Sequence, residues 1–572
     1  MQRHDPRAAL DHFPTSLRVE LSIITPPSCI IAYGCSFQAK PPLCGVSGLD
    51  KCRGSRALNR RYVSWTSFDL EGLPVKIWSN VCLNVQRNPL VWALPLQALL
   101  LLSNLDLLDP WADEWFTLIT VPKPMSEVVS GVAGNIHPPL YFILLHYWIQ
   151  FPWALSQIAG MRAMSAVWAL VATAVVYFLW LRREQIRFQQ MFLALWVLSP
   201  CLLLHARMAR SYSMQVALAS LAIYSALQWA EQPQNWKRFL AYVGSSTALL
   251  YTHYLSGLAV AAGVCVMFLI KKRFTSAATQ VAVLAVLYAP WVPTLGSVLR
   301  RWNWIGIPYP YEGGNLVFDQ IVRLGYLFVS FSFGETHSTI SLLLGVVLTP
   351  VVIYALWRGI ETRPSWLPIV LLSTGIAWIG VSRFEQFVFM PAHLLFVLPF
   401  FLILIVQRMK PLTFAALLVL YVTADYAYFT RSGFFVKPYA APFREVAEVI
   451  LDGSAGRAAI VAVDRHGSFS QPLLDRLGGS VPVMFLDDEA SAREVLEPPR
   501  GGPPGPSIIW LWRRTRDISP GSFITKVEQD LSLGHEVRHR EFIAYSLPER
   551  WARRLLRGPG QRQYYYRLSE FR

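Results

Sequence analysis

The sequence predicts a polytopic α-helical membrane protein with a small α/β domain at its C-terminal end. Of the 572 residues, 53% are hydrophobic and only 15% are charged, a balance that is unlike that of a soluble globular protein. Apolar runs recur between residues 88 and 430, and most approach the about 20 residues that a helix needs to cross a bilayer. After residue 440 the apolar runs become short and alternate with amphipathic segments, which indicates a folded domain outside the bilayer.

Residues 1–87 differ in composition from the rest of the chain. They have scattered Pro, Gly and Ser, and their start lacks the apolar core of a cleavable signal, so we expect a cytoplasmic N-terminus. We interpret this segment as a disordered leader or an overextended reading frame. It holds five of the seven cysteines, but these lack the close pairs of a structural zinc module, so we predict no metal site here. The five are Cys29, Cys35, Cys44, Cys52 and Cys82.

Residues 88–435 form the predicted membrane domain, with 11 to 13 crossings of the inner membrane of the cell envelope. Two shorter apolar segments, 138–154 and 317–334, are assigned to the membrane interface, because the basic turns between spans then all fall on the cytoplasmic side. The loop 109–160, which begins with acidic residues, then lies outside, and so does the C-terminal tail. The eleven main candidates cover residues 88–108, 161–181, 189–206, 210–230, 239–253, 254–270, 275–295, 338–357, 365–381, 388–406 and 412–430.

Residues 436–572 form the predicted extracytoplasmic α/β domain. The domain contains no nucleotide-binding glycine fingerprint or hydrolase elbow, so we expect it to bind or position something. Its predicted strands cover 459–464, 481–487 and 507–512, its predicted helices cover 469–477, 490–496 and 522–531, the run 500–506 is a turn, and the tyrosines at 564–566 begin a final strand.

The net charge of +16 is spread over the turns between spans and an Arg-rich C-terminal end. Anionic lipid head groups are therefore the expected partner of these charges, and no nucleic acid is expected.

Two adjacent carboxylates stand out beside an apolar span. Asp113 and Glu114 lie in the run DEWFT, and the run HPP at 137–139 then opens another apolar segment. Charged groups beside a bilayer often serve chemistry, and a carboxylate can act as a general base. The alternative interpretation is that Asp113 or Glu114 caps a helix that begins near Trp115.

Six motifs in order carry a resemblance to a known family: DEWFT, HPPLYFILLHYW, GMRAMSAVWAL, HARMARSYSMQVAL, YTHYLSGLAV and MPAHLLFVLPF. Over about residues 90–440 the chain resembles the GT-C glycosyltransferases that use polyprenyl-phosphate sugars, which include protein O-mannosyltransferases and lipid A aminoarabinose transferases. The resemblance implies an inverting transfer from a polyprenyl-monophosphate sugar to a lipid, glycan or protein acceptor on the extracytoplasmic face. It implies no metal and no cofactor.

The resemblance also implies roles for individual residues. Asp113 matches the family's base, with Glu114 as its partner. Arg207 and Arg210 are also notable in their own right, because they lie outside against the positive-inside trend. The residues expected to bind donor phosphate or substrate are His137, Arg162, Arg207, Arg210, Tyr212, His253, Arg383 and His393.

Three of the donor-binding candidates have a plainer interpretation. His137 also fits a solvated loop, Arg162 also fits a side chain that reaches lipid head groups, and His253 also fits an interfacial aromatic belt. The chain departs from its relatives at Met208, where many carry an acid, and at Ala392-His393, where many have Arg-Tyr. Arg383 and His393 are both candidates for the missing arginine's role.

The aromatic loop 300–316 suits either stacking on a sugar or anchoring at the interface. The main rival function is a polytopic transporter or lipid flippase, although no duplicated motif between the two halves supports it. A second rival is an envelope polymerase or ligase with a lipid-pyrophosphate donor, which metal dependence would distinguish.

Overall fold

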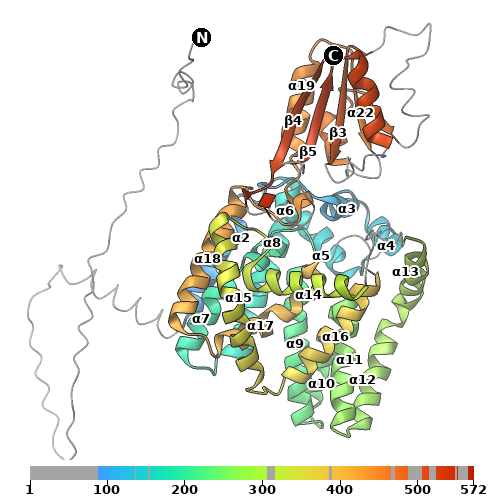
Figure 1. The fold of residues 1–572 in the computed structure, drawn as a ribbon. Helices are drawn as coiled ribbons and strands as arrows, with labels where there is room; N and C mark the ends of the chain where they lie inside the picture. The colour runs from blue at the N-terminus through green and yellow to red at the C-terminus, as the bar shows by residue number, and fades with distance from the viewer. Residues whose placement is uncertain are drawn as a thin grey trace, which may run out of the picture. The chain divides into compact units, whose positions relative to one another are not determined.

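The computed structural model contains a large helical domain followed by a small α/β domain (Figure 1). It describes residues 88–135, 137–152, 155–305, 316–384, 390–464, 471–486, 506–514, 523–547, 550–551 and 564–572. The chain divides into two compact units, Met1–Leu70 and Glu71–Arg572, and the first lies wholly outside the described residues. The predictions for residues 1–87, for the helix 490–496, for nearly all of the turn 500–506 and for most of the loop 300–316 also fall outside them.

The helical domain consists of helices joined by short turns (Figure 1). The α-helices are α2 (Leu90–Leu102), α3 (Ala112–Thr120), α4 (Met125–Gly134), α5 (Leu140–Ile149), α6 (Gln157–Val176), α7 (Ile186–Val197), α8 (Pro200–Ala206), α9 (Tyr212–Glu231), α10 (Trp236–Leu250), α11 (Tyr254–Ile270), α12 (Phe274–Tyr288), α13 (Val292–Ile305), α14 (Leu316–Phe333), α15 (Thr339–Ile360), α16 (Leu367–Phe384), α17 (Leu398–Val406) and α18 (Pro411–Phe429). Shorter turns of other helix types are η2 (Tyr177–Leu181), η3 (Ala289–Trp291), η4 (Pro391–Val397) and η5 (Lys437–Ala440).

Every one of the eleven predicted spans overlaps a helix. Among the described residues, four continuous helical segments are long and apolar enough to cross a membrane: Gln157–Leu181, Phe274–Arg300, Thr339–Ile360 and Pro411–Phe429. The pair α7 and α8 is a fifth candidate that is bent by 52°. Several other predicted spans correspond to apolar helices of 10–17 residues, so helix length alone supports fewer crossings than eleven.

Local sequence explains where these helices break and begin. Ser199 precedes Pro200 and is extended, because a residue before proline disfavours the helical conformation, and this ends α7. The Ser199 side chain then accepts a hydrogen bond from the backbone of Leu202 and starts α8. Ser338 starts α15 with a capping box completed by Ser341.

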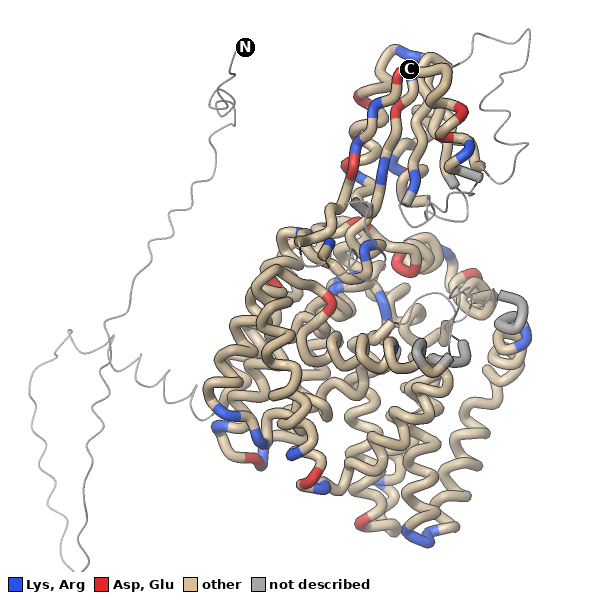
Figure 2. The backbone as a smooth tube through the Cα atoms, viewed as in Figure 1, with Lys and Arg blue, Asp and Glu red and all other residues tan. Residues whose placement is uncertain are grey.

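Charged residues gather at the ends of the helices, and the long apolar segments between them carry few (Figure 2). Large apolar side chains stay exposed along the spans, and Val346 of α15 is 76% exposed. This distribution is typical of helices that face hydrocarbon.

Small residues allow the central helices to pack closely. α9 packs against α6 and α10, and Ala219 and Ala222 of α9 are fully buried there. α11 packs against α16 at Gly263, where a Cβ atom would lie 2.4 Å from the Ser373 hydroxyl. A side chain at residue 263 would therefore force these two helices apart.

The α/β domain contains one sheet of order β2-β1-β3-β5-β4 (Figure 1). β1 is parallel to β2 and β3, with Val461 opposite both Val483 and Trp510, whereas β5 is antiparallel to β3 and β4. The strands are β1 (Ala459–Asp464), β2 (Val483–Leu486), β3 (Ile508–Arg514), β4 (Val537–Ala544) and β5 (Tyr564–Phe571), and the helices are α19 (Phe443–Ser454), α20 (Gln471–Leu477) and α22 (Phe523–Gly534).

Alternation along the strands supplies a core on each face of the sheet. Val461 and Trp510 pack in the core formed with α19 and α20, whereas Ala462 and Leu511 pack in the core formed with α22. The three predicted strands and the final strand at the tyrosine run are present in the sheet. β4 was not predicted, because its sequence VRHREFIA is mostly polar and most of its side chains are exposed at the edge of the sheet.

Candidate active site

Asp113 and Glu114 lie in the first turn of α3, where the helix dipole favours carboxylates. The N-cap position is Trp111, which makes no side-chain capping bond, and the helix begins at Ala112. The interpretation of these carboxylates as caps of a helix starting near Trp115 is therefore wrong. Consecutive side chains of a helix point about 100° apart, so the two carboxylates have different surroundings.

Glu114 is buried in an ion pair with Arg162 of α6. Two hydrogen bonds of 2.8 Å join the Nε and Nη2 atoms of Arg162 to the two carboxylate oxygens. The backbone N–H of Ala209 donates to the same carboxylate at 2.8 Å, and Glu114 is only 1% exposed. The Nη1 atom of Arg162 donates to the carbonyls of Leu105 and Leu108. Glu114 and Arg162 thus join α3, α6 and the loop after α2.

Asp113 is the more open carboxylate, with a side chain that is 35% exposed. One of its oxygens lies 3.6 Å from the Nη2 atom of Arg210, which is too long for a hydrogen bond. The Nη1 atom of Arg210 donates to the backbone carbonyl of Asp113 at 3.2 Å. Arg210 therefore positions this end of α3 and leaves the Asp113 carboxylate able to accept a proton from a bound molecule.

His137 lies on the other side of Arg210. The Nη2 atom of Arg210 is 3.1 Å from Nε2 and 3.3 Å from Nδ1 of the imidazole. Because arginine only donates, the ring nitrogen that accepts carries no proton. Burial, and then the charge of Arg210 and the rings of His393 and His253, hold the pKa of His137 well below its ordinary value. His137 is therefore neutral at pH 7.

His253 and His393 form a hydrogen-bonded pair of imidazoles. Nδ1 of His253 caps α11 by accepting from the backbone of Ser256 at 3.4 Å, so its proton is on Nε2. Nε2 lies 3.0 Å from Nδ1 of His393 and donates to it. Burial, followed by His393 and Arg210, lowers the pKa of His253 well below its ordinary value. Because Nδ1 of His393 accepts this bond, the N–H of that ring is on Nε2.

The structure thus brings five of the predicted residues into one cluster, which we call the Arg210 cluster. Tyr212 borders it: its ring centroid is 6.1 Å from that of His393 and 5.6 Å from that of His205. The five members are Asp113, His137, Arg210, His253 and His393.

Arg207 lies outside this cluster although it is only three residues from Arg210. Its guanidinium donates to the carbonyls of Leu100, Leu101 and Asn104 at the C-terminal end of α2. Its Nε atom donates to the Tyr428 hydroxyl at 3.0 Å. Arginine at this end of a helix satisfies carbonyls that lack partners, so the contacts of Arg207 stabilise the end of α2.

The remaining predicted positions add less to the site. Met208 is buried between the two arginines and supplies no carboxylate. Arg383 belongs to α16, but its side chain lies outside the described part of the chain.

An apolar pocket of about 580 Å³ lies beside His137 and is lined by Pro139, two residues further along the chain. The backbone carbonyl of His137 accepts a hydrogen bond from the Tyr254 hydroxyl, which in turn accepts one from the indole of Trp291. Trp291 is also a wall of the pocket, so the His137 backbone and the pocket share a scaffold. The walls come from α4, α5, α10, α12 and η3 and from the residues that flank α5 and α10: Val129, Pro139, Leu140, Ile143, Gly244, Thr247, Ala248, Tyr251, Leu287 and Trp291.

Sequence reasoning missed two supporting side chains. The Tyr141 hydroxyl lies 2.7 Å from that of Ser165, which donates to the backbone carbonyl of Arg210 at 3.0 Å. Tyr141 is part of the HPPLYF motif and Ser165 follows Arg162 by three residues, so both lay in quoted motifs. Nothing in their type distinguished them from ordinary packing residues.

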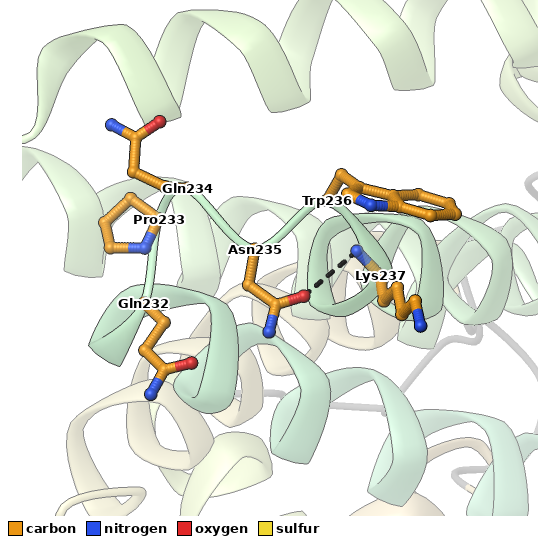
Figure 3. A pocket seen from close by; sticks show the side chains of 6 residues that line it. All are labelled: Gln232, Pro233, Gln234, Asn235, Trp236 and Lys237. Carbon is orange, nitrogen blue, oxygen red and sulfur yellow. Dashed lines mark hydrogen bonds between the residues drawn. The ribbon is translucent and has the colours of Figure 1, made fainter.

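A second pocket, of about 620 Å³, lies at the turn between α9 and α10 (Figure 3). Its walls are the consecutive residues 232–237, and Asn235 there caps α10 through the backbone of Lys237. This open turn contains none of the predicted site residues.

No family model and no curated protein matches the chain. Solved structures are similar to it at low identity. The apo crystal structure of ArnT from Cupriavidus metallidurans is 12% identical with a TM-score of 0.48, covering 87% of this chain and 98% of that one. The same protein bound to undecaprenyl phosphate is 12% identical with a TM-score of 0.44, covering 84% and 97%.

A third similar structure is the Archaeoglobus fulgidus oligosaccharyltransferase in complex with Zn and sulfate. It is 13% identical with a TM-score of 0.40, covering 69% of this chain and 62% of that one. Because these likenesses are limited, the chemistry of the present chain has to come from its own side chains.

Proposed function

We propose that this chain is an integral membrane glycosyltransferase that moves a sugar, with inversion, from a polyprenyl-monophosphate donor to a lipid, glycan or protein acceptor. The reaction takes place on the extracytoplasmic face, where the α/β domain also lies, and the N-terminus is cytoplasmic. One observation carries the proposal: an accessible carboxylate, Asp113, lies beside a buried guanidinium, Arg210, that also contacts neutral His137. Base and phosphate-binding groups are thus adjacent.

Asp113 is the general base of the proposed reaction. It removes a proton from an acceptor hydroxyl or amine as the acceptor oxygen or nitrogen forms a bond to the anomeric carbon. The bond between that carbon and the phosphate oxygen breaks on the opposite face, so the configuration inverts. The electron pair of the broken bond leaves with polyprenyl phosphate, and the proton stays on Asp113.

Arg210 and the imidazoles receive the leaving phosphate. The guanidinium is 5% exposed and is held by its contacts with Asp113 and His137, so it is already oriented before the donor binds. Neutral imidazoles can donate hydrogen bonds to phosphate oxygens without the cost of burying a further charge. The N–H of His253 is already donated to His393, so the Nε2–H of His393 is the group of this pair that extends the donor surface.

Glu114 and Arg162 take a positioning role in this proposal. Their oxygens and nitrogens are engaged with each other and with backbone groups, and both side chains are buried. They hold α3 against α6 and the backbone of residue 209, next to Arg210. We therefore assign Glu114 to the support of Asp113 and not to proton transfer.

The apolar pocket beside His137 fits the lipid part of such a donor. It begins at Pro139, two residues after His137, and its walls are almost entirely apolar. A phosphate at His137 and Arg210 would therefore lie close to a surface that suits an isoprenoid chain.

The test is transfer of radiolabelled sugar from a panel of polyprenyl-phosphate sugars by the purified protein in membranes. Asp113→Asn should lower the rate about 100-fold or more, the usual contribution of a general base. Glu127→Gln, which changes an exposed acid of α4, should leave the rate unchanged. Transfer by Asp113→Asn at the wild-type rate would refute the proposal, and substrate flux into vesicles without transfer would favour a transporter.

A further inference from the structure

A second group of chemically reactive side chains lies in the core, apart from the Arg210 cluster. Cys201 and His205 are four residues apart in α8 and so share one face of that helix. Glu335 follows α14 in a short loop. All three side chains are fully buried, and one possible ligand atom from each lies within 4.8 Å of the others.

We propose that Cys201, His205 and Glu335 bind one divalent transition-metal ion of the zinc type. Thiolate, imidazole and carboxylate are the three side-chain ligands that zinc uses in proteins. A thiolate in the set also selects against magnesium and calcium, which prefer oxygen ligands. The two anionic ligands balance the charge of a divalent ion, so the ion can be buried without leaving a net charge in the core.

The spacing of the ligand atoms is close to that around a tetrahedral zinc ion. Tetrahedral zinc with ordinary bond lengths separates its ligand atoms by roughly 3.3–3.7 Å. At present Nε2 of His205 lies 2.6 Å from a carboxylate oxygen of Glu335. On binding, the thiol of Cys201 would release its proton, and the proton between His205 and Glu335 would move to Nδ1 of His205, which leaves Nε2 and the carboxylate oxygen free for the ion. Only small side-chain movements are needed for this exchange.

Neighbouring hydroxyls orient the proposed ligands. The Ser330 hydroxyl lies 3.3 Å from the Cys201 sulfur and 3.1 Å from one Glu335 oxygen, so it holds these two together. The Tyr326 hydroxyl donates to the other Glu335 oxygen at 2.7 Å. Groups that fix a carboxylate in this way are typical around metal ligands and strengthen metal binding.

The backbone brings Glu335 to α8 through a close approach. Gly334 has a φ of +89°, and a Cβ atom there would lie 2.4 Å from the side chain of Pro200. Only glycine fits this position, since both the φ value and the contact exclude a side chain. The backbone of Glu335 is then fixed by a hydrogen bond from Phe435 at 3.0 Å.

The proposed ion would have a structural role. It would join α8 to the loop after α14, and the His205 ring packs against Tyr212, which borders the Arg210 cluster. The inference rests on Cys201, His205 and Glu335 alone and does not depend on the proposed sugar transfer.

The test compares the metal content of the full-length protein, purified without chelator, with that of two cysteine variants. Cys201→Ser removes a ligand, and Cys265→Ser changes the other cysteine of the described residues, in α11. Elemental analysis should give one equivalent of metal that Cys201→Ser loses and Cys265→Ser keeps. Cobalt added to protein stripped of metal should show a thiolate charge-transfer band that Cys201→Ser loses and Cys265→Ser keeps. The cysteines of residues 1–87 are the same in both variants, so they cancel in the comparison.

Tyr326→Phe provides a milder variant, because it removes only one hydroxyl and keeps every ligand. It should weaken cobalt binding about 10-fold or more, as expected for a group that orients a ligand. The inference is overturned if Cys201→Ser keeps the metal and the band. If Cys201→Ser does not fold, as judged by circular dichroism and size exclusion, unchanged cobalt affinity in Tyr326→Phe overturns it instead.

Discussion

At the residue scale, Asp113 and Glu114 show how two adjacent carboxylates acquire different functions. Glu114 accepts three hydrogen bonds from Arg162 and Ala209 and has no room for a substrate. Asp113 is one-third exposed and has one loose ion pair with Arg210. The first arrangement supports structure, and the second leaves a base available for chemistry.

Glu114→Gln should therefore destabilise the protein more than Asp113→Asn does. The change leaves the buried Arg162 without a charge partner, which typically costs about 3 kcal/mol or more. Thermal unfolding in detergent measures the difference, with Asp113→Asn as the matched control because its side chain is partly exposed. Equal melting temperatures for the two variants would contradict these separate roles.

The buried histidines predict how stability depends on pH. Burial lowers the pKa of His137 and of His253 below the ordinary value of about 6.5. Between the lowered and the ordinary pKa values the unfolded chain binds more protons than the folded chain, so stability falls as pH falls below about 6.5. Above that pH these two groups do not contribute to the pH dependence of stability.

Unfolding measured from pH 5 to pH 8 checks this dependence. His137→Gln should reduce the loss of stability below pH 6.5, because the lowered pKa of this imidazole no longer contributes. His535→Gln, which changes a histidine that directly follows α22 and lies outside the cluster, should leave the pH profile as in the wild type. An unchanged profile in His137→Gln would show that burial of this ring does not govern the effect.

At the element scale, the segment between α8 and α9 separates two arginines that look alike in the sequence. Arg207 binds the C-terminal carbonyls of α2, whereas Arg210 contacts Asp113 and His137. The sequence alone identified both arginines as unusual, but it did not show which of them faces the candidate site. These partners lie 73 to 107 residues away along the chain, so the distinction depends on the tertiary fold.

Arg207→Gln should lower stability by roughly 2 kcal/mol or more, because several charged hydrogen bonds to carbonyls are lost. The KM for the donor should stay the same in the folded fraction. Arg210→Gln should instead raise the KM or lower kcat, because it removes the group proposed to bind phosphate. Thermal unfolding and transfer kinetics on both variants distinguish the roles. The same kinetic defect in Arg207→Gln and Arg210→Gln would contradict them.

The sequence predicted the helices better than their ends. The range 189–206 reads as one apolar run, but Pro200 divides it into α7 and α8 with a 52° bend. The range 88–108 extends past the end of α2 at Leu102, because hydropathy registers neither the extended backbone at Ser103 nor the carbonyls at this end that accept from Arg207. Hydrophobicity predicts that a helix exists, and local hydrogen bonds decide where it stops.

At the scale of the whole molecule, one acidic side chain links the helical domain to the α/β domain. Asp109 lies in the loop between α2 and α3 and is buried. One of its oxygens accepts from the backbone of Arg444 in α19 at 2.8 Å, and the other pairs with Arg476 in α20. The loop that precedes Asp113 is thus tied to the α/β domain.

Asp109→Asn should loosen this connection, because the amide cannot pair with the charge of Arg476. Hydrogen exchange in residues 104–111 should become faster than in the wild type. Asp452→Asn, which changes an exposed acid of α19, provides the control. Exchange that is equally slow in both variants would show that Asp109 does not hold the loop.

The sequence thus predicted the class of the molecule and the segments that meet in the candidate site, whereas several contacts within that site required the fold. The motifs around 113, 137, 210, 253 and 393 were quoted together, and the structure places one residue from each in the Arg210 cluster. The pairing of Glu114 with Arg162 could not be predicted, because it depends on the packing of α3 against α6. The cluster of His205 and Glu335 was missed for the same reason.

The most direct test of the proposed function is a single-turnover measurement with a polyprenyl-phosphate sugar already bound to the protein. Mixing with acceptor should give sugar transfer in the wild type. In Asp113→Asn the rate should fall about 100-fold or more, with donor affinity nearly unchanged. Equal single-turnover rates for the two proteins would contradict Asp113 as the base and remove the central step of the mechanism.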